Sequence, residues 1–242
     1  IGFCLVGSEM CIRDRDTATQ ACTLALWDEQ RVRARHALEA RAHNRHVLTM
    51  LAEVLDGQCL SDAVDVIACG VGPGSFTGLR VAVSVAQGLA WSQNLPVHGF
   101  CTLTAQVHAA AASGLLRDGA MVLTTIDAQI NQLYARWGRW IGGRFLPEGD
   151  VVVSAPEALP LPGTLEPLVL LGSGAHYCEQ LPSSVRDLAE VFDEVTPNAA
   201  VMAELLGTGA LTLAPQPAYE LSPQYVQRDI GWKKLAEQVR RG

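Results

Sequence analysis

The feature that most constrains this chain is the glycine-rich segment from Gly70 to Arg80, which reads GVGPGSFTGLR. Only glycine enters the φ > 0 region cheaply and proline fixes its own φ, so the four glycines and one proline impose a defined backbone path. Before the segment, the largely apolar stretch from Val64 to Cys69 predicts a short buried strand. After it, Val81 to Trp91 contains neither proline nor an acidic residue, which favours a helix. The segment therefore predicts a strand, a tight loop and a helix in succession.

The composition limits the classes of protein to which this chain can belong. Of the 242 residues, 49% are hydrophobic and 18% are charged, which is typical of a soluble globular chain with a sizeable core. The formal net charge of -7 argues against direct binding of a nucleic-acid backbone, because such binding depends on an excess of lysine and arginine. The seven cysteines are scattered and include no CxxC pair, so we expect neither a disulfide framework nor a zinc site. No apolar run is long enough to span a bilayer, and we expect a cytoplasmic protein without membrane contact.

The chain is predicted to form two α/β lobes. Residues 1–15 follow no clear strand or helix period and resemble the translated adapter read-through found at the ends of some metagenomic gene models, so we expect them to be non-native or disordered. Residues 16–113 are predicted to form an N-terminal lobe, and residues 114–242 a second, smaller lobe with a C-terminal tail. Apolar periodicity and capping residues predict helices at 43–55, 77–91, 102–112 and 199–206, and strands that include 121–126 and 168–171.

The predicted helix after the glycine-rich segment has an unusual surface. Small residues recur at every fourth position, at Gly78, Ala82, Ala86 and Ala90, and such a row lets another backbone approach closely. The remaining positions are largely apolar as well. A helix that is apolar all round is usually covered on more than one side. We therefore expect one cover to be the sheet and the other to be a second protein.

The glycine-rich segment admits a nucleotide-binding interpretation and a structural one. Backbone N–H groups at a helix N-terminus can hold an anion, which makes Gly72, Gly74, Ser75 and Thr77 candidates for an anion-binding loop. The segment matches neither the GxGxxG fingerprint nor a P-loop, since no GK[ST] occurs. Ser75 and Thr77 are also conceivable nucleophiles, but Ser75 does not lie in a GxSxG elbow. A structural turn is the favoured interpretation.

Two further groups of polar residues were weighed for ligand binding. Asp16 and Thr17 could hold a cation or orient phosphate oxygens, although an aspartate in such a turn more often caps its own backbone. His43 and His46 lie three positions apart on a predicted helix and could be two metal ligands, but an exposed helix face explains them equally well. No third ligand lies in a companion motif, so we predict no metal site.

Four stretches resemble the bacterial TsaB (YeaZ) family. The longest is the glycine-rich segment with its alanine-rich helix to Trp91. The others are DTAT at 16–19, IDA at 126–128, and YVQRD at 225–229 with the WKK at 232–234. The similarity runs from Asp16 almost to the end of the chain.

The resemblance implies a fold and a function. The fold is that of the actin, Hsp70 and sugar-kinase superfamily, a two-lobed, ribonuclease H-like α/β fold with mixed sheets flanked by helices. The function is that of a non-catalytic subunit in the modification of tRNA to threonylcarbamoyladenosine. Such a subunit pairs with the TsaD transferase, is joined by the TsaE ATPase, and meets tRNA only through the complex. The resemblance implies no cofactor beyond weak nucleotide binding at the shared interface.

The same resemblance implies that the two helices 43–55 and 77–91 form the partner interface. Its residues are expected to be His43, Val47, Met50, Gly78, Arg80, Ala82, Ala86 and Ala90. Two alternatives stay open. The chain could be an ATP-using or glycoprotease-like enzyme of peptidase family M22 type, or it could form a homodimer when TsaD is absent, because an apolar face takes the partner it finds.

The chain departs from the family pattern in two places. The family enters the DTAT stretch from an apolar first strand, whereas residues 13–15 here read RDR. Charges in a central strand are costly to bury, so we expect a weak or displaced first strand. Residues 129–131 read QIN where the family commonly has Arg-Met-Gly, so Gln129 stands in place of a basic residue.

Overall fold

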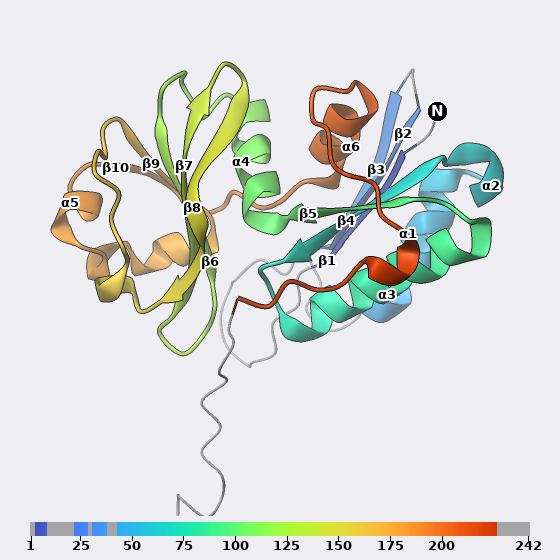
Figure 1. Cartoon of the computed structure of the whole chain (residues 1–242), viewed down its shortest axis with the longest axis horizontal. Helices are drawn as coiled ribbons and strands as arrows, with labels where there is room; N and C mark the ends of the chain where they lie inside the picture. The colour runs from blue at the N-terminus through green and yellow to red at the C-terminus, as the bar shows by residue number, and fades with distance from the viewer. Residues whose placement is uncertain (1–2, 9–21, 29–30, 38–42, 227–242) are drawn as a thin grey trace, which may run out of the picture.

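The computed structural model describes residues 3–8, 22–28, 31–37 and 43–226 (Figure 1). The strands are β1 (Phe3–Ser8), β2 (Cys22–Asp28), β3 (Arg31–Ala37), β4 (Val66–Gly72), β5 (Val97–Cys101), β6 (Met121–Asp127), β7 (Leu133–Ile141), β8 (Arg144–Ser154), β9 (Leu168–Leu171) and β10 (Ala189–Phe192). The α-helices are α1 (His43–Leu55), α2 (Leu60–Ala63), α3 (Phe76–Gln93), α4 (Thr102–Ala112), α5 (Ser183–Arg186) and α6 (Ala199–Gly207). Short 3-10 helices are η1 (Pro156–Ala158), η2 (Ser173–Gln180) and η3 (Ala218–Glu220).

Each lobe contains one mixed sheet of five strands. The first sheet has the order β3-β2-β1-β4-β5, and the second has the order β10-β9-β6-β7-β8. In the first sheet β1 pairs antiparallel with β2 and parallel with β4, and in the second β6 pairs antiparallel with β7 and parallel with β9. The expected two-lobed α/β architecture, with mixed sheets flanked by helices, is thereby confirmed.

The first strand differs from the expectation for residues 1–15. Phe3–Ser8 forms the central strand of the first sheet, with Leu5 opposite Ala25 on one side and Ala68 on the other. A physical reason lies in the apolar sequence of this stretch, which suits a strand paired on both edges. The charged residues 13–15, for which we predicted a weak or displaced strand, lie outside the described residues.

The two faces of the first sheet are covered by different helices. Leu24 and Leu26 on β2 belong to a core with residues of α1 and α3, whereas Ala25 between them belongs to a second core with residues of α6. This alternation follows from the two-residue period of a strand. Figure 1 shows α1 and α3 together on one side of this sheet and α6 on the other.

The chain returns to the first lobe after completing the second. We predicted that everything after residue 113 lies in the second lobe, and the second sheet does begin after the end of α4. However, α6 packs on the first sheet, close enough that a Cβ on Gly207 would overlap the ring of Trp27. Ala218 and Leu221 then join the core formed with α1 and α3. The second lobe is therefore an insertion between two parts of the first lobe.

Helix α4 lies between the two sheets (Figure 1). Eight of its eleven residues are buried. Ala105 contributes to the core under α6 in the first lobe, whereas Val107 and Ala110 contribute to a core on the second sheet. The many alanines of α4 explain how two sheets can both approach the same helix closely.

A buried polar network fixes α4 to the second sheet. The Gln106 side-chain amide donates to the Thr124 hydroxyl at 2.9 Å and to the Thr125 carbonyl at 3.2 Å. The Thr124 hydroxyl donates to the Leu103 carbonyl at 3.2 Å, and the Thr125 hydroxyl to the Leu171 carbonyl at 2.7 Å. These buried polar groups therefore hold hydrogen-bond partners, as stability requires.

Candidate functional site

The glycine-rich segment forms the predicted strand, loop and helix. Strand β4 ends at Gly72, whose φ of 126° is a conformation that side-chain-bearing residues rarely adopt. The Ser75 hydroxyl then accepts a hydrogen bond from the Gly78 N–H at 3.3 Å and caps the N-terminus of α3. The prediction of strand, tight loop and helix is confirmed.

The chain's own C-terminal segment, residues 216–226, packs along α3 and over this loop. The Gln87 side chain donates to the Leu221 carbonyl at 2.9 Å, and the Gln224 N–H donates to the Val71 carbonyl at 2.7 Å. A Cβ on Gly72 would lie 2.8 Å from the Gln224 carbonyl oxygen. Gly72 is therefore required by a close approach between two backbones.

This arrangement supports the structural interpretation of the loop. Gly72 is buried beneath the C-terminal segment, Gly74 and Thr77 are half-buried, and the Ser75 hydroxyl is engaged with the helix. Asp16 and Thr17, the other members of the predicted anion site, lie outside the described residues. Nucleotide binding at this loop stays a prediction.

An exposed cluster of three side chains lies where the C-terminal segment meets the first turns of α3. The guanidinium carbon of Arg80 lies 3.7 Å from the centre of the Phe76 ring and 5.8 Å from that of Tyr225. Arg80 Nε donates to the Tyr225 hydroxyl at 2.8 Å, and the two aromatic rings are 5.4 Å apart. Phe76 is 51% exposed and Tyr225 45% exposed. We call these three residues the Arg80 cluster.

The row of small residues on α3 does not face outward. Ala82, Ala86 and Ala90 are fully buried, and all three belong to the chain's own core with residues of α1. The prediction that this row is offered to a partner is therefore wrong for these alanines. The physical reason is that the sheet and α1 already use the close approach that small residues permit. Gly78, at the start of the row, is buried as well.

The predicted interface residues of α1 are corrected in the same way. Val47 and Met50 are buried in the core of the first lobe. The side chain of His43 lies outside the described residues, as does that of His46. Of the eight predicted interface residues, Arg80 is exposed in the described structure. Exposed apolar side chains on the two helices are instead Leu48, Phe76 and Trp91.

The second lobe brings together polar residues that the sequence left isolated. The Asp127 carboxylate at the end of β6 accepts hydrogen bonds from the Gln129 N–H at 2.8 Å, the Gln129 amide at 3.2 Å and the Tyr177 hydroxyl at 3.4 Å. His176 Nε2 lies 4.0 Å from the same carboxylate, and the Ser173 hydroxyl accepts from the Asp127 N–H. We missed this cluster because Asp127 and Tyr177 are about fifty positions apart.

Burial and the Asp127 carboxylate together raise the pKa of the Tyr177 hydroxyl. Burial is the larger cause, and the carboxylate adds to it because a phenolate beside an anion is disfavoured. The phenol therefore stays protonated and can donate to Asp127 at neutral pH. Within the described part of the chain, no three histidine, cysteine, aspartate or glutamate side chains gather as metal ligands.

The loop between β6 and β7 has a strained backbone. Gln129, Ile130 and Asn131 all have φ between 54° and 66°, which is costly for residues other than glycine and most of all for a β-branched one. Ile130 at its tip is 91% exposed. The two hydrogen bonds from Gln129 to Asp127 hold one side of the loop, so Gln129 has a local structural role.

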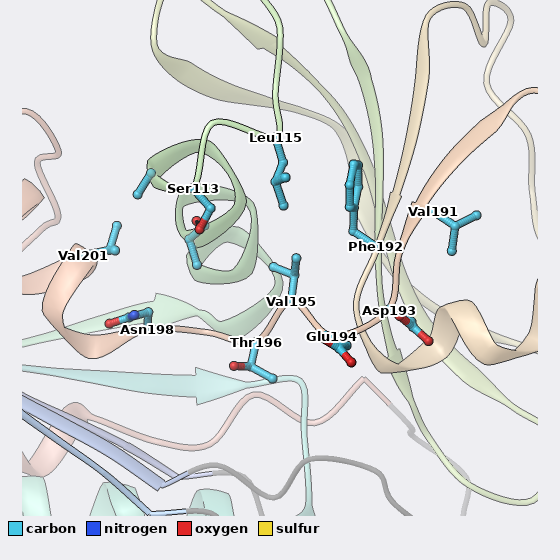
Figure 2. A pocket seen from close by; sticks show the side chains of 12 residues that line it. Ser113, Leu115, Val191, Phe192, Asp193, Glu194, Val195, Thr196, Asn198 and Val201 are labelled. Carbon is cyan, nitrogen blue, oxygen red and sulfur yellow. Dashed lines mark hydrogen bonds between the residues drawn. The ribbon is translucent and has the colours of Figure 1, made fainter.

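A pocket of about 500 Å³ lies where the chain passes between the lobes (Figure 2). Ser113 and Leu115 line it after α4, and Asp193, Glu194 and Thr196 line it from the segment that follows β10. Its lining mixes apolar and polar side chains, includes two carboxylates and contains no lysine, arginine or histidine. None of the residues predicted to bind a ligand or partner lines this pocket.

Two mixed sheets that share a central helix, with a glycine turn leading into α3, define an α/β protein of the actin-like class. A family model described as tRNA N6-adenosine threonylcarbamoyltransferase (TsaD) matches residues 37–204. In the described part of the chain, no helix combines the length and apolar character needed to cross a membrane.

Curated relatives agree on the family. The tRNA threonylcarbamoyladenosine biosynthesis protein TsaB of Haemophilus influenzae is 32% identical over 230 residues, which cover 91% of this chain and 94% of that protein. The protein of the same name from Escherichia coli is 32% identical over 233 residues, covering 91% and 96%. The chain belongs to the TsaB family of tRNA threonylcarbamoyladenosine biosynthesis proteins.

Solved structures give the same result for the fold. YeaZ from Pseudomonas aeruginosa superimposes with a TM-score of 0.78 at 28% identity, covering 93% of this chain and 99% of that one. A second structure from P. aeruginosa, described as an uncharacterized protein with similarity to peptidase YEAZ, gives a TM-score of 0.79 with the same identity and coverage. The resemblance found in the sequence is thereby confirmed.

Proposed function

We propose that this chain is a non-catalytic subunit that pairs with a TsaD-type transferase in the synthesis of threonylcarbamoyladenosine in tRNA. The names of the relatives support a role in this biosynthesis rather than the peptidase or ATP-using alternative. The match to a transferase family model supports a common fold for the two subunits. In this proposal a TsaE-type ATPase joins the pair in the cytoplasm, and tRNA meets the chain only through the complex.

The observation that carries the pairing is the exposed apolar surface of α1 and α3. Leu48 on α1 is 59% exposed, and Phe76 and Trp91 at the two ends of α3 are 51% and 70% exposed. Both helices lie on the same side of the first sheet (Figure 1). Large aromatic and aliphatic side chains are enriched at the centres of protein interfaces, where they lose contact with water. These side chains therefore suit a protein partner.

The same proposal includes an expectation about where a nucleotide would bind. The C-terminal segment covers Gly72, so we place any weak nucleotide binding at the interface with the transferase rather than in the loop alone. The chain is then expected to bind Mg-ATP weakly or not at all by itself. Isothermal titration of the isolated chain and of the pair with Mg-ATP compares the two states directly.

Co-expression with the cognate transferase tests the pairing. We expect the two chains to elute together in size-exclusion chromatography, and we expect the pair to restore threonylcarbamoyladenosine in tRNA of cells depleted of their own TsaB, as measured by nucleoside mass spectrometry. Leu48→Asp should weaken the pairing, because it places a charge on the apolar surface. Ile141→Asp, an exposed apolar residue in the second lobe, is the matched control. Rapid ATP or peptide hydrolysis by the chain alone would overturn the proposal.

A further inference from the structure

The Arg80 cluster has the properties of a preorganised binding centre. An exposed arginine side chain ordinarily samples many rotamers, and fixing it on binding costs free energy. Here Phe76 contacts one face of the guanidinium, and the Tyr225 hydroxyl holds Nε. The terminal NH1 and NH2 groups form the remaining edge of the planar group, and the hydrogen bond to Tyr225 does not involve them. The edge that stays available is the one that binds a carboxylate through two parallel hydrogen bonds.

The charge of Arg80 has no counter-ion in the part of the chain that the structure describes. Other arginines there do have one: Arg35 lies 2.7 Å from Glu53, and Arg139 lies 3.1 Å from Glu148. Arg80 instead contacts a phenyl ring and a phenol, neither of which is a carboxylate. An anion from outside the described residues would complete the cluster.

The surroundings of the cluster favour a protein as the source of that anion. Tyrosine, phenylalanine and arginine are enriched in interface cores, and two half-exposed rings beside a fixed guanidinium provide apolar area to bury. The net charge of -7 disfavours attraction of a nucleic-acid phosphate backbone to this chain. An acidic side chain on a folded partner satisfies both the charge and the apolar contact.

We propose that the Arg80 cluster is the energetic centre of the interface with the transferase subunit and that it binds a carboxylate of that subunit. This inference rests on the proposed function and adds two points to it. It names the chemistry of the contact, and it extends the interface from the helices to the C-terminal segment, which contributes Tyr225. Tyr225 acts as a positioning residue, because the Gln224 N–H bonded to Val71 anchors the backbone beside it.

Affinity measurements on the purified pair test the inference. We expect Arg80→Met to raise the Kd for the transferase about 30-fold, as truncation of an interface hot spot does. Arg80→Lys should lose about tenfold, because lysine keeps the charge but not the planar fork. Tyr225→Phe should lose about threefold, since the ring remains and only the bond to Nε is removed. Arg139→Met, the matched control in the second lobe, should bind like the unmodified chain.

The dependence on salt separates a charge contact from simple loss of packing. Affinity of the unmodified chain should fall more steeply with added NaCl than affinity of Arg80→Met, because the variant lacks the ion pair. All four variants should melt close to the unmodified chain, since the substituted side chains are exposed or lie at the surface. Equal affinity of Arg80→Met and the unmodified chain would overturn the inference and leave the proposed pairing intact. Failure of the unmodified chain to bind the transferase would overturn both.

Two other occupants are outcomes of the same experiment. If Arg80→Met leaves subunit affinity unchanged but weakens tRNA binding by the assembled complex, the cluster contacts RNA and the inference is wrong. If the variant abolishes only self-association of the isolated chain in sedimentation velocity, the occupant is a second copy and the inference is again wrong. Weakened pairing with the transferase and unchanged tRNA affinity of the assembled pair would support it.

Discussion

Substitution of Gly72 by alanine tests the packing of the C-terminal segment against the glycine loop. The added Cβ would lie 2.8 Å from the Gln224 carbonyl oxygen and 3.2 Å from Leu79 Cδ1. The first neighbour is a backbone atom that cannot rotate away, and Gln224 is itself bonded to Val71 through its N–H. The φ of 126° at Gly72 adds backbone strain for any residue with a Cβ.

The expected loss is worked from these two effects. Backbone strain of this kind costs about 1–3 kcal/mol, and forcing an extra carbon into a packed site costs a similar amount. We therefore expect Gly72→Ala to lower the free energy of unfolding by about 3 kcal/mol. For a chain of this size that corresponds to a fall in Tm of roughly 6–12 °C. Urea and thermal unfolding followed by circular dichroism measure both quantities.

Gly88→Ala is the matched control. Gly88 lies on the exposed side of α3, and a Cβ there meets nothing within 4 Å. Alanine is the better helix former, so this variant should gain about 1 kcal/mol. If Gly72→Ala is as stable as the unmodified chain, the close approach of the two backbones does not exist and the reasoning about the loop fails.

Three further predictions concern buried and polar groups. Burial lowers the pKa of His108 below its ordinary 6.5, so on acidification the unfolded state takes up a proton before the folded state does. The free energy of unfolding should therefore fall as the pH drops below 6.5. In urea titrations at pH 7.5 and 5.5, His108→Gln should show a smaller difference in this free energy than the unmodified chain does. Ala86→Leu should lose about 1–3 kcal/mol of stability by overpacking, whereas exposed Ser84→Leu should change it by less than about 0.5 kcal/mol; equal effects would contradict the inward orientation. Asp127→Asn should lower the pKa of Tyr177, measured by absorbance at alkaline pH, and an unchanged value would exclude their contact.

Local signals allowed much of the fold to be predicted from the sequence. The helices 43–55 and 102–112 and the strand 168–171 were predicted with the bounds that the structure shows. Each has a clear periodic spacing of apolar residues and is bounded by residues that start or stop such an element, so the residues that predict it lie close together in the sequence. The backbone path of the glycine-rich segment is likewise determined by its own glycines and proline.

Features that depend on distant packing could not be predicted in this way. The spacing of Ala82, Ala86 and Ala90 defines a row on a helix, but it does not say which row faces the sheet. The return of α6 to the first lobe depends on the fit of Gly207 against Trp27, which are 180 positions apart. The Arg80 cluster needs Tyr225 brought to the start of α3, and the sequence placed the two residues in different lobes.

The shared position of α4 bears on how the whole molecule moves. Two-lobed proteins often open and close about a hinge between their lobes. In this chain such a motion would have to pull α4 away from one of the two sheets, which either exposes its apolar contacts with the first lobe or breaks its apolar contacts and the Gln106 bonds with the second. We expect the two lobes to unfold in one cooperative step and to tumble as one rigid body. A protein held by the first lobe would thus keep a constant orientation relative to the second.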